Sequence, residues 1–102
     1  MKRIIHGRKY STDTAEFIAK NEEGFRGNYK RYYEGLYRKK TGEFFLAVNG
    51  GPLSRYGIRT VDGQLCENTG EIIPLSLEEA KEWVENNLNA DSYEDLFGEV
   101  DE

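Results

Sequence analysis

Five consecutive apolar residues, FFLAV at 44–48, constrain the fold more than any other feature of this chain. A strand with one face in water alternates apolar and polar residues, whereas a strand that is apolar at every position is buried on both faces. The run is short, and turn-forming residues bound it, KTGE at 40–43 before it and NGGP at 49–52 after it. We therefore expect a central strand with protein packed on both of its sides.

Further strands are expected around this central one. Residues 29–40 alternate loosely and are rich in tyrosine, which favours a strand. Tyr29, Arg31, Tyr33, Gly35 and Tyr37 would lie on one face, with Tyr32 and Leu36 on the other. Glycine-containing turns separate the remaining extended segments. A hairpin is predicted from residues 2–5 and 8–10, and a strand at 56–61 with a short return strand at 64–67. A turn at 68–70 would then lead to an extended stretch at 71–74.

A first helix is predicted over residues 11–24, STDTAEFIAKNEEG. Asp13 and Glu16 have the spacing of a capping box, Thr12 is a second candidate cap, and Gly24 is placed to end a helix. The inward face of this helix would consist of Ala15, Phe17, Ile18 and Asn21.

Two more helices are predicted near the C-terminus. Ser76 and Glu79 form a capping-box pair, and apolar residues then recur at three- and four-residue spacing. A shorter helix at 92–97 would begin near Asp91 and end at Gly98. The predicted order is ββ-α-βββ-αα. This is an α+β fold with an antiparallel sheet of about four to five strands, an N-terminal helix and two C-terminal helices, in one domain over residues 1–102.

Charge is distributed unevenly along the chain. Residues 1–70 carry 13 Lys/Arg and 8 Asp/Glu, whereas residues 71–102 carry only Lys81 against 11 Asp/Glu. The first part has a net charge of +5 and the second −10, which together give the −5 of the whole chain. Such asymmetry indicates a charged partner, although the two parts could also attract each other or simply keep the protein in solution.

The sequence predicts no catalytic centre. His6 is the only histidine and lies beside a glycine in a predicted turn, and Cys66 has no histidine near it in sequence to activate it. No zinc ligand set of ordinary type and no phosphate-binding loop can be found. We expect a protein that is not an enzyme, with no cofactor and no metal. The lone cysteine and the lack of a long apolar run favour the cytoplasm.

The first candidate binding surface is acidic. Carboxylates spaced along rigid helices can imitate a row of phosphates and occupy a cationic groove on another protein. The ordinary alternative is a solvated helix face. The residues predicted to bind a partner are Glu78, Glu79, Glu82, Glu85, Asp91, Glu94 and Asp95.

The second candidate surface is basic and aromatic. Aromatic rings interleaved with cations hold single-stranded nucleic acid, because the rings stack on bases and the cations contact phosphates. The residues of this alternative site are Arg31, Tyr33, Tyr37, Arg38, Lys39 and Lys40. The ordinary explanation, which we favour, is that one tyrosine face is core and the lysines flank a turn.

Three segments carry a resemblance to a known group of proteins: KRIIHGRKYSTDTAE, LYRKKTGEFFLAVNGGPLSRY and IIPLSLEEAKEWVENNLNADSYEDLFG. Together they resemble small proteins of plasmids, phages and integrated elements of Gram-positive bacteria. Some small proteins of such elements are anti-CRISPR inhibitors of Cas9-type nucleases, and several of these are acidic. The resemblance implies an inhibitor whose partner is a host defence nuclease or another nucleic-acid-handling protein. The alternatives are a nucleic-acid-binding accessory module and an antitoxin-like partner of another small protein, and no membrane partner is expected.

Overall fold

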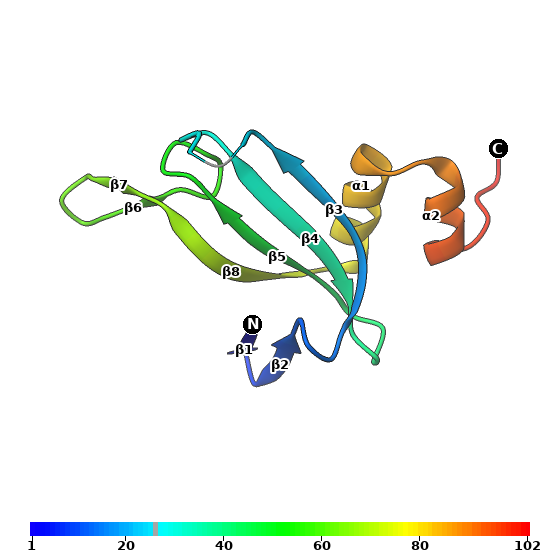
Figure 1. The fold of residues 1–102 in the computed structure, drawn as a ribbon. Helices are drawn as coiled ribbons and strands as arrows, with labels where there is room; N and C mark the ends of the chain where they lie inside the picture. The colour runs from blue at the N-terminus through cyan, green and yellow to red at the C-terminus, as the bar shows by residue number, and fades with distance from the viewer. Residues whose placement is uncertain (26) are drawn as a thin grey trace.

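A computed structural model describes residues 1–25 and 27–102 and has an α+β architecture (Figure 1). A four-stranded antiparallel sheet of order β3-β4-β5-β8 is accompanied by two separate hairpins, β1–β2 and β6–β7. The strands are β1 (Lys2–Ile5), β2 (Arg8–Ser11), β3 (Glu16–Glu23), β4 (Tyr32–Arg38), β5 (Phe44–Gly50), β6 (Ile58–Arg59), β7 (Leu65–Cys66) and β8 (Asn68–Leu75). The helices α1 (Leu77–Asn87) and α2 (Ala90–Phe97) follow at the C-terminal end.

The strand β5 is the centre of the fold, as the apolar run predicts. It lies between β4 and β8, and all five residues of the run are buried. Leu46 and Val48 point toward α1, where they pack with Trp83 and Val84. Phe45 points to the opposite face of the sheet, where it belongs to a second apolar cluster. Two separate cores therefore share this one strand.

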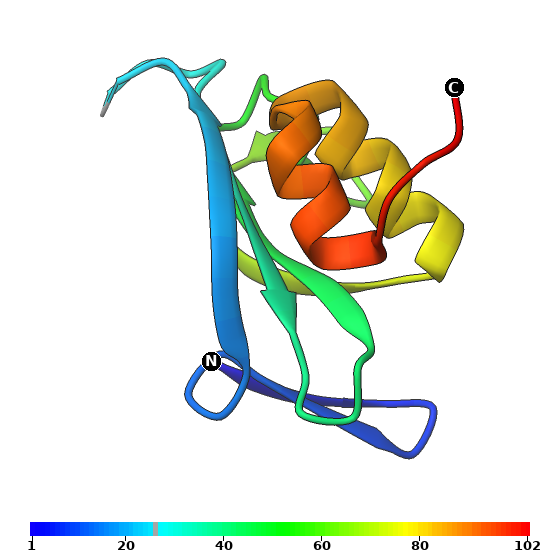
Figure 2. The ribbon, with the colours of Figure 1, turned by 90° about the vertical axis from the view of Figure 1, so that its right-hand side faces the viewer.

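The β1–β2 hairpin lies across one end of the sheet (Figure 2), where it packs on the face opposite the helices. The Tyr10 ring meets the Phe45 ring edge-on at a centroid distance of 5.6 Å, and Tyr37 stacks on Phe45 at 5.3 Å. Ile5 and Ile72 pack against the same cluster. The hairpin predicted at the N-terminus is confirmed, and it supplies the second layer that a doubly buried strand needs.

The N-terminal helix predicted over 11–24 is wrong, because most of this segment forms strand β3. The Ser11 hydroxyl accepts a hydrogen bond from the backbone N–H of Asp13, so the residues expected to cap a helix instead form a turn. A β-bulge between Phe17 and Ala19 then breaks the alternation of the strand. Phe17 pairs with Tyr37 on one face, whereas Ile18 and Ala19 both pack toward the helices. This irregular pattern imitates helical spacing.

Other boundaries also differ from those predicted. Residues 68–70 belong to β8, which extends from Asn68 to Leu75 and has a register irregularity between Asn68 and Glu71. The strand expected at 56–61 is only the two-residue β6, which pairs with β7 to form a short hairpin. The cap of α2 is Asn89, whose side chain accepts from the Ser92 N–H, and not Asp91. Both C-terminal helices and the Ser76–Glu79 capping box are confirmed.

No helix within residues 1–25 and 27–102 is long and apolar enough to cross a membrane.

Gly50, the last residue of β5, and Gly51 after it have a packing role. The backbone N–H of Gly51 donates to the carbonyl of Arg31, and a Cβ built at Gly51 would lie 2.4 Å from the carbonyl oxygen of Tyr29. The chain's own 28–31 segment therefore occupies the space that these glycines leave open. This contact fixes the loop that carries Arg55 and Tyr56 toward the sheet.

Replacing Gly51 with alanine is expected to destabilise the fold by about 1–3 kcal/mol, because the methyl group collides with backbone that cannot move freely. Gly70→Ala is the matched control. A Cβ at Gly70 would lie 2.6 Å from the Met1 methyl group, the end of a flexible side chain that can move aside. Urea unfolding of both variants measures the difference, and equal effects would contradict the close approach described here.

Candidate functional site

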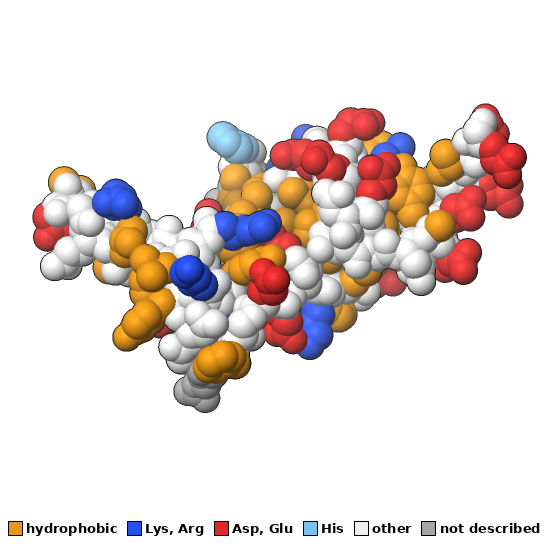
Figure 3. All heavy atoms as spheres, turned by 90° about the horizontal axis from the view of Figure 1, so that it is seen from above, with side chains coloured by type: hydrophobic (Ala, Val, Ile, Leu, Met, Phe, Trp, Pro, Cys, Tyr) orange, Lys and Arg blue, Asp and Glu red, His pale blue; other side chains and the backbone are white. Residues whose placement is uncertain are grey.

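The predicted partner-binding residues lie together on the helical layer, which we call the acidic face: Glu78, Glu79, Glu82, Glu85, Asp91, Glu94 and Asp95. Helical periodicity turns Ala80, Trp83 and Val84 into the core and leaves Glu82 and Glu85 exposed. Asp91 and Asp95 of α2 are also exposed, while Glu94 is half-buried. Figure 3 shows carboxylate side chains gathered over this end of the molecule.

The capping box makes the start of α1 rigid. The Ser76 hydroxyl accepts from the Glu79 N–H at 3.1 Å, and the Glu79 carboxylate accepts from the Ser76 N–H at 2.9 Å. These hydrogen bonds favour the charged carboxylate, so the pKa of Glu79 is lowered. The Glu79 carboxylate is therefore hydrogen-bonded at the start of the helix, whereas Glu78, Glu82 and Glu85 are exposed to solvent.

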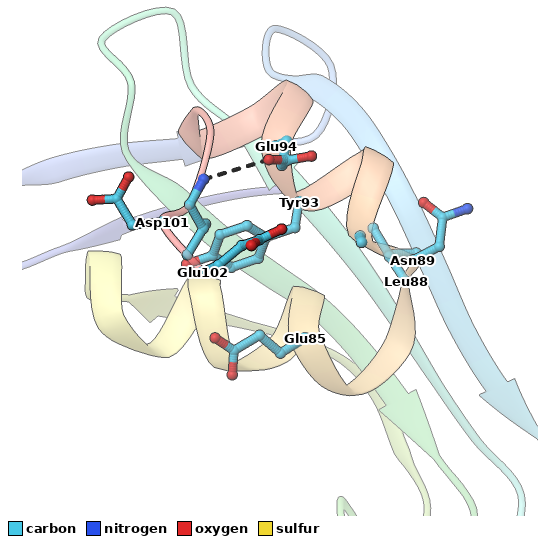
Figure 4. Close-up of a pocket in the computed structure, with 9 residues that line it drawn as sticks. Glu85, Leu88, Asn89, Tyr93, Glu94, Asp101 and Glu102 are labelled. Atoms are coloured by element: carbon cyan, nitrogen blue, oxygen red, sulfur yellow. Dashed lines mark hydrogen bonds between the residues drawn. The ribbon is translucent and has the colours of Figure 1, made fainter.

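A hollow of about 510 Å³ lies between α1, α2 and the C-terminal segment (Figure 4). Glu85, Glu94, Asp101 and Glu102 line it, with the ring of Tyr93 among them. The backbone N–H of Val100 donates to the Glu94 carboxylate at 3.4 Å. Carboxylates around an aromatic ring form an environment suited to a lysine or arginine side chain.

No ion pair reaches the acidic face among the described residues, although Lys81 shares a hollow with Glu78, Glu82 and Glu85, and Arg55 shares another with Glu79 and Glu82. All six ion pairs formed by residues 1–25 and 27–102 join side chains between Arg8 and Glu67. Lys81, the one cation on α1, lies over the Phe97 ring with its ammonium 5.9 Å from the centroid. The alternative that the acidic part attracts the basic part of the same chain is therefore not supported.

These carboxylates are spread out and do not converge. Within the described part of the chain, no group of three or more His, Cys, Asp or Glu side chains is arranged to hold a metal ion. Helical spacing separates Glu78, Glu82 and Glu85 in a row along α1, while Asp91 and Asp95 lie on the neighbouring helix α2. A row of separate charges is suited to an extended cationic surface.

Most side chains of the alternative basic and aromatic site already contact other side chains of this chain. Each of its arginines has a carboxylate partner, with Arg31 2.6 Å from Glu67 and Arg38 2.8 Å from Glu16. Lys39 lies 3.6 Å from Glu43. Lys40 is exposed, and no ion pair is found for it among the described residues.

The two tyrosines of that site, Tyr33 and Tyr37, also pack against other residues of the sheet. Tyr37 stacks on Phe45, and burial raises its pKa. Tyr33 lies along the sheet, since its hydroxyl is 3.0 Å from the position where Gly35 would carry a Cβ. Both rings are half-buried. This arrangement agrees with the ordinary explanation of the strand, in which one tyrosine face is core.

A buried carboxylate that the sequence did not single out lies under α1. Glu34 of β4 is only 3% exposed, yet it has four partners. It accepts hydrogen bonds from the Trp83 indole and the Asn21 amide, each at 3.1 Å, and from the Tyr56 hydroxyl. The Arg55 guanidinium is 3.6 Å away and lies 4.7 Å from the centroid of the Tyr32 ring. No short-range pattern marks Glu34, because its partners come from β3, α1 and the 51–57 loop.

This network joins the acidic face to the sheet. Glu79, Glu82 and Trp83 of α1 line a hollow of about 380 Å³ whose other wall includes Glu34 and Arg55. Every donor around Glu34 compensates its loss of hydration, and losing one leaves the charge partly unsatisfied. The network therefore fixes α1 in position on the sheet.

His6 and Cys66 lie in different hairpins. His6 is in the turn between β1 and β2 with a φ of 51°, and Cys66 is half-buried in β7. The turn predicted at His6-Gly7 is confirmed. The two hairpins are separate sheets, and Figure 1 shows them at different places on the molecule. The structure thus gives no support to an activated cysteine.

Tyr56→Phe is expected to lower the free energy of unfolding by about 1.5–3 kcal/mol near neutral pH, because Glu34 loses a hydrogen bond to a charged group. Burial and the adjacent Glu34 raise the pKa of Tyr56 well above its ordinary value. The raised pKa stabilises the fold below pH about 10, and this contribution declines as pH rises through the pKa of the folded state. The difference between parent and variant should therefore shrink in strong alkali.

Tyr29→Phe is the matched control, since Tyr29 is 68% exposed. Chemical unfolding at neutral and alkaline pH measures both variants. An unchanged stability in Tyr56→Phe, or an equal loss in Tyr29→Phe, would show that the Glu34 network does not hold α1 in place.

Comparison with known proteins identifies no relative: no protein-family model, no curated protein and no solved structure matches this chain. The resemblance to proteins of mobile elements stays a prediction. The charges and contacts of the acidic face are therefore the basis for a proposed function.

Proposed function

We propose that this protein is a non-enzymatic inhibitor that uses the acidic face to bind a cationic groove on a nucleic-acid-handling protein. The observation that carries the proposal is the absence of any ion pair to the acidic face among the described residues, while six cations of the basic part pair with carboxylates of that same part. An uncompensated row of carboxylates attracts a cationic surface over a long range.

The geometry supports phosphate mimicry in particular. Carboxylates at regular helical intervals present separate negative charges, as the backbone of DNA does. The helices hold them in fixed places, because α1 is capped at Ser76 and anchored through Trp83 to Glu34. A rigid surface loses little conformational freedom on binding.

The hollow at Tyr93 adds a place for one side chain of the partner. A lysine or arginine entering it would meet Glu85 and Glu94 together with the aromatic ring. Cationic side chains of this kind line the grooves in which nucleases hold nucleic acid. The resemblance to mobile-element proteins makes a Cas9-type nuclease the first partner to test.

Reversal of three exposed carboxylates tests the proposal. In the variant Glu78→Lys, Glu82→Lys, Glu85→Lys, affinity for a Cas9-type nuclease loaded with its guide should fall by roughly 100-fold or more, because close interfacial charge pairs become repulsive. The loss should be largest at low ionic strength. Equilibrium binding and inhibition of DNA cleavage provide the two measurements.

The matched control reverses three exposed carboxylates elsewhere: Asp13→Lys, Glu23→Lys, Asp62→Lys. This variant has the same net charge but leaves α1 and α2 unchanged, so it should keep its inhibition. Unchanged inhibition in the helix variant would remove the acidic face as the site. Equal losses in both variants would mean that only net charge matters.

A further inference from the structure

A positively charged surface is left unused by the proposed function. We call it the basic ribbon, and it consists of Lys2, Arg3, Arg8 and Lys9 of the β1–β2 hairpin with Lys39 and Lys40 of the turn after β4. Residues 1–12 contain no Asp or Glu, so this hairpin carries a net charge of +4 from its side chains. It forms a two-stranded sheet of its own beside the main sheet.

The register of the hairpin determines which cations face solvent. Arg3 pairs with Tyr10, and Tyr10 is buried against the main sheet. The alternate positions Lys2, Ile4 and Lys9 therefore share the outward face, where Ile4 pairs with Lys9. Ile4 is 65% exposed. The outward face is thus a short strip with an apolar residue between two lysines.

Contacts with the next turn extend this positive surface. Arg8 donates to the Glu43 carboxylate at 3.1 Å, and the Lys39 ammonium lies 4.3 Å from the centroid of the Tyr10 ring. Arg8, together with Lys39, lowers the pKa of Glu43, which therefore remains charged. One carboxylate thus neutralises only part of the charge of two cations. Lys2, Lys9 and Lys40 have no ion pair among the described residues.

The ribbon is also separated from the acidic face. It packs on the Phe45 side of the sheet, whereas α1 and α2 pack on the Leu46 side (Figure 2). Figure 2 shows the hairpin across the end of the sheet, away from the two helices, and no ion pair joins them among the described residues. Each surface remains available to a partner of its own.

We propose that the basic ribbon binds the phosphate backbone of duplex nucleic acid. A two-stranded ribbon has a width that the major groove admits. Lysines at its outward face and in the neighbouring turn can contact phosphates, and Ile4 can make apolar contact in the groove. This surface goes beyond the proposed function, because it binds nucleic acid where the acidic face binds protein. A chain with both surfaces is suited to a nucleoprotein complex, in which each component meets the opposite charge.

The test is the binding of the full chain to a fluorescent DNA duplex, followed by anisotropy while the salt concentration is raised. If three lysines contact phosphates, a fourfold rise in salt should weaken binding by about 40-fold. The variant Lys2→Gln, Lys9→Gln, Lys40→Gln should lose this binding and most of its salt dependence. These three side chains are exposed, and the thermal unfolding of the variant should match that of the parent.

The matched control, Lys20→Gln, Lys30→Gln, Lys81→Gln, removes the same charge away from the ribbon and should bind as the parent does. Loss of binding only in the ribbon variant supports the proposal. The proposal is overturned if the parent does not bind the duplex at low salt, or if both variants lose affinity equally. Because no nuclease is present, neither outcome bears on the acidic face.

Discussion

The burial of both faces of β5 is the constraint on which the rest of the structure depends. Phe45 and Leu46 are neighbours in sequence but belong to opposite cores, so each side of the sheet needs its own cover. The helices provide it on one side and the β1–β2 hairpin on the other. The hairpin is basic and the helices are acidic, so the elements that bury the two faces of the strand also hold opposite charges at separate places on the sheet.

This separation explains why the charges of the chain do not neutralise one another. Ion pairs form among residues 8–67, where strands and turns bring opposite charges together. The helices instead receive their anchor from a buried carboxylate, since Trp83 donates to Glu34 through the sheet-facing side of α1. The outward side of α1 remains unpaired among the described residues. The inner side of the helices thus stabilises the fold, and binding is the role we propose for the outer side.

Sequence patterns predicted the elements whose signals are local. The run at 44–48 marks β5, and Ser76 with Glu79 marks the start of α1, because burial on two faces and helix capping depend on adjacent residues. The strand β3 could not be recognised in this way, since its bulge places the adjacent residues Ile18 and Ala19 on the same side and its pairing with β4 is non-local. The role of Glu34 could not be predicted either, because its contacts are also non-local. Its donors Asn21, Tyr56 and Trp83 come from three distant segments. The acidic residues were located correctly on two helices, but their lack of partners became visible only in three dimensions.

The central claim is that the acidic face occupies a groove meant for nucleic acid. Competition tests it most directly: the protein is added to an immobilised, guide-loaded Cas9-type nuclease with and without target DNA already in the groove. The account predicts that prior DNA prevents binding of the protein, and that prior protein prevents binding of DNA. Simultaneous binding of both at full stoichiometry would contradict it, because two ligands cannot fill one cationic groove.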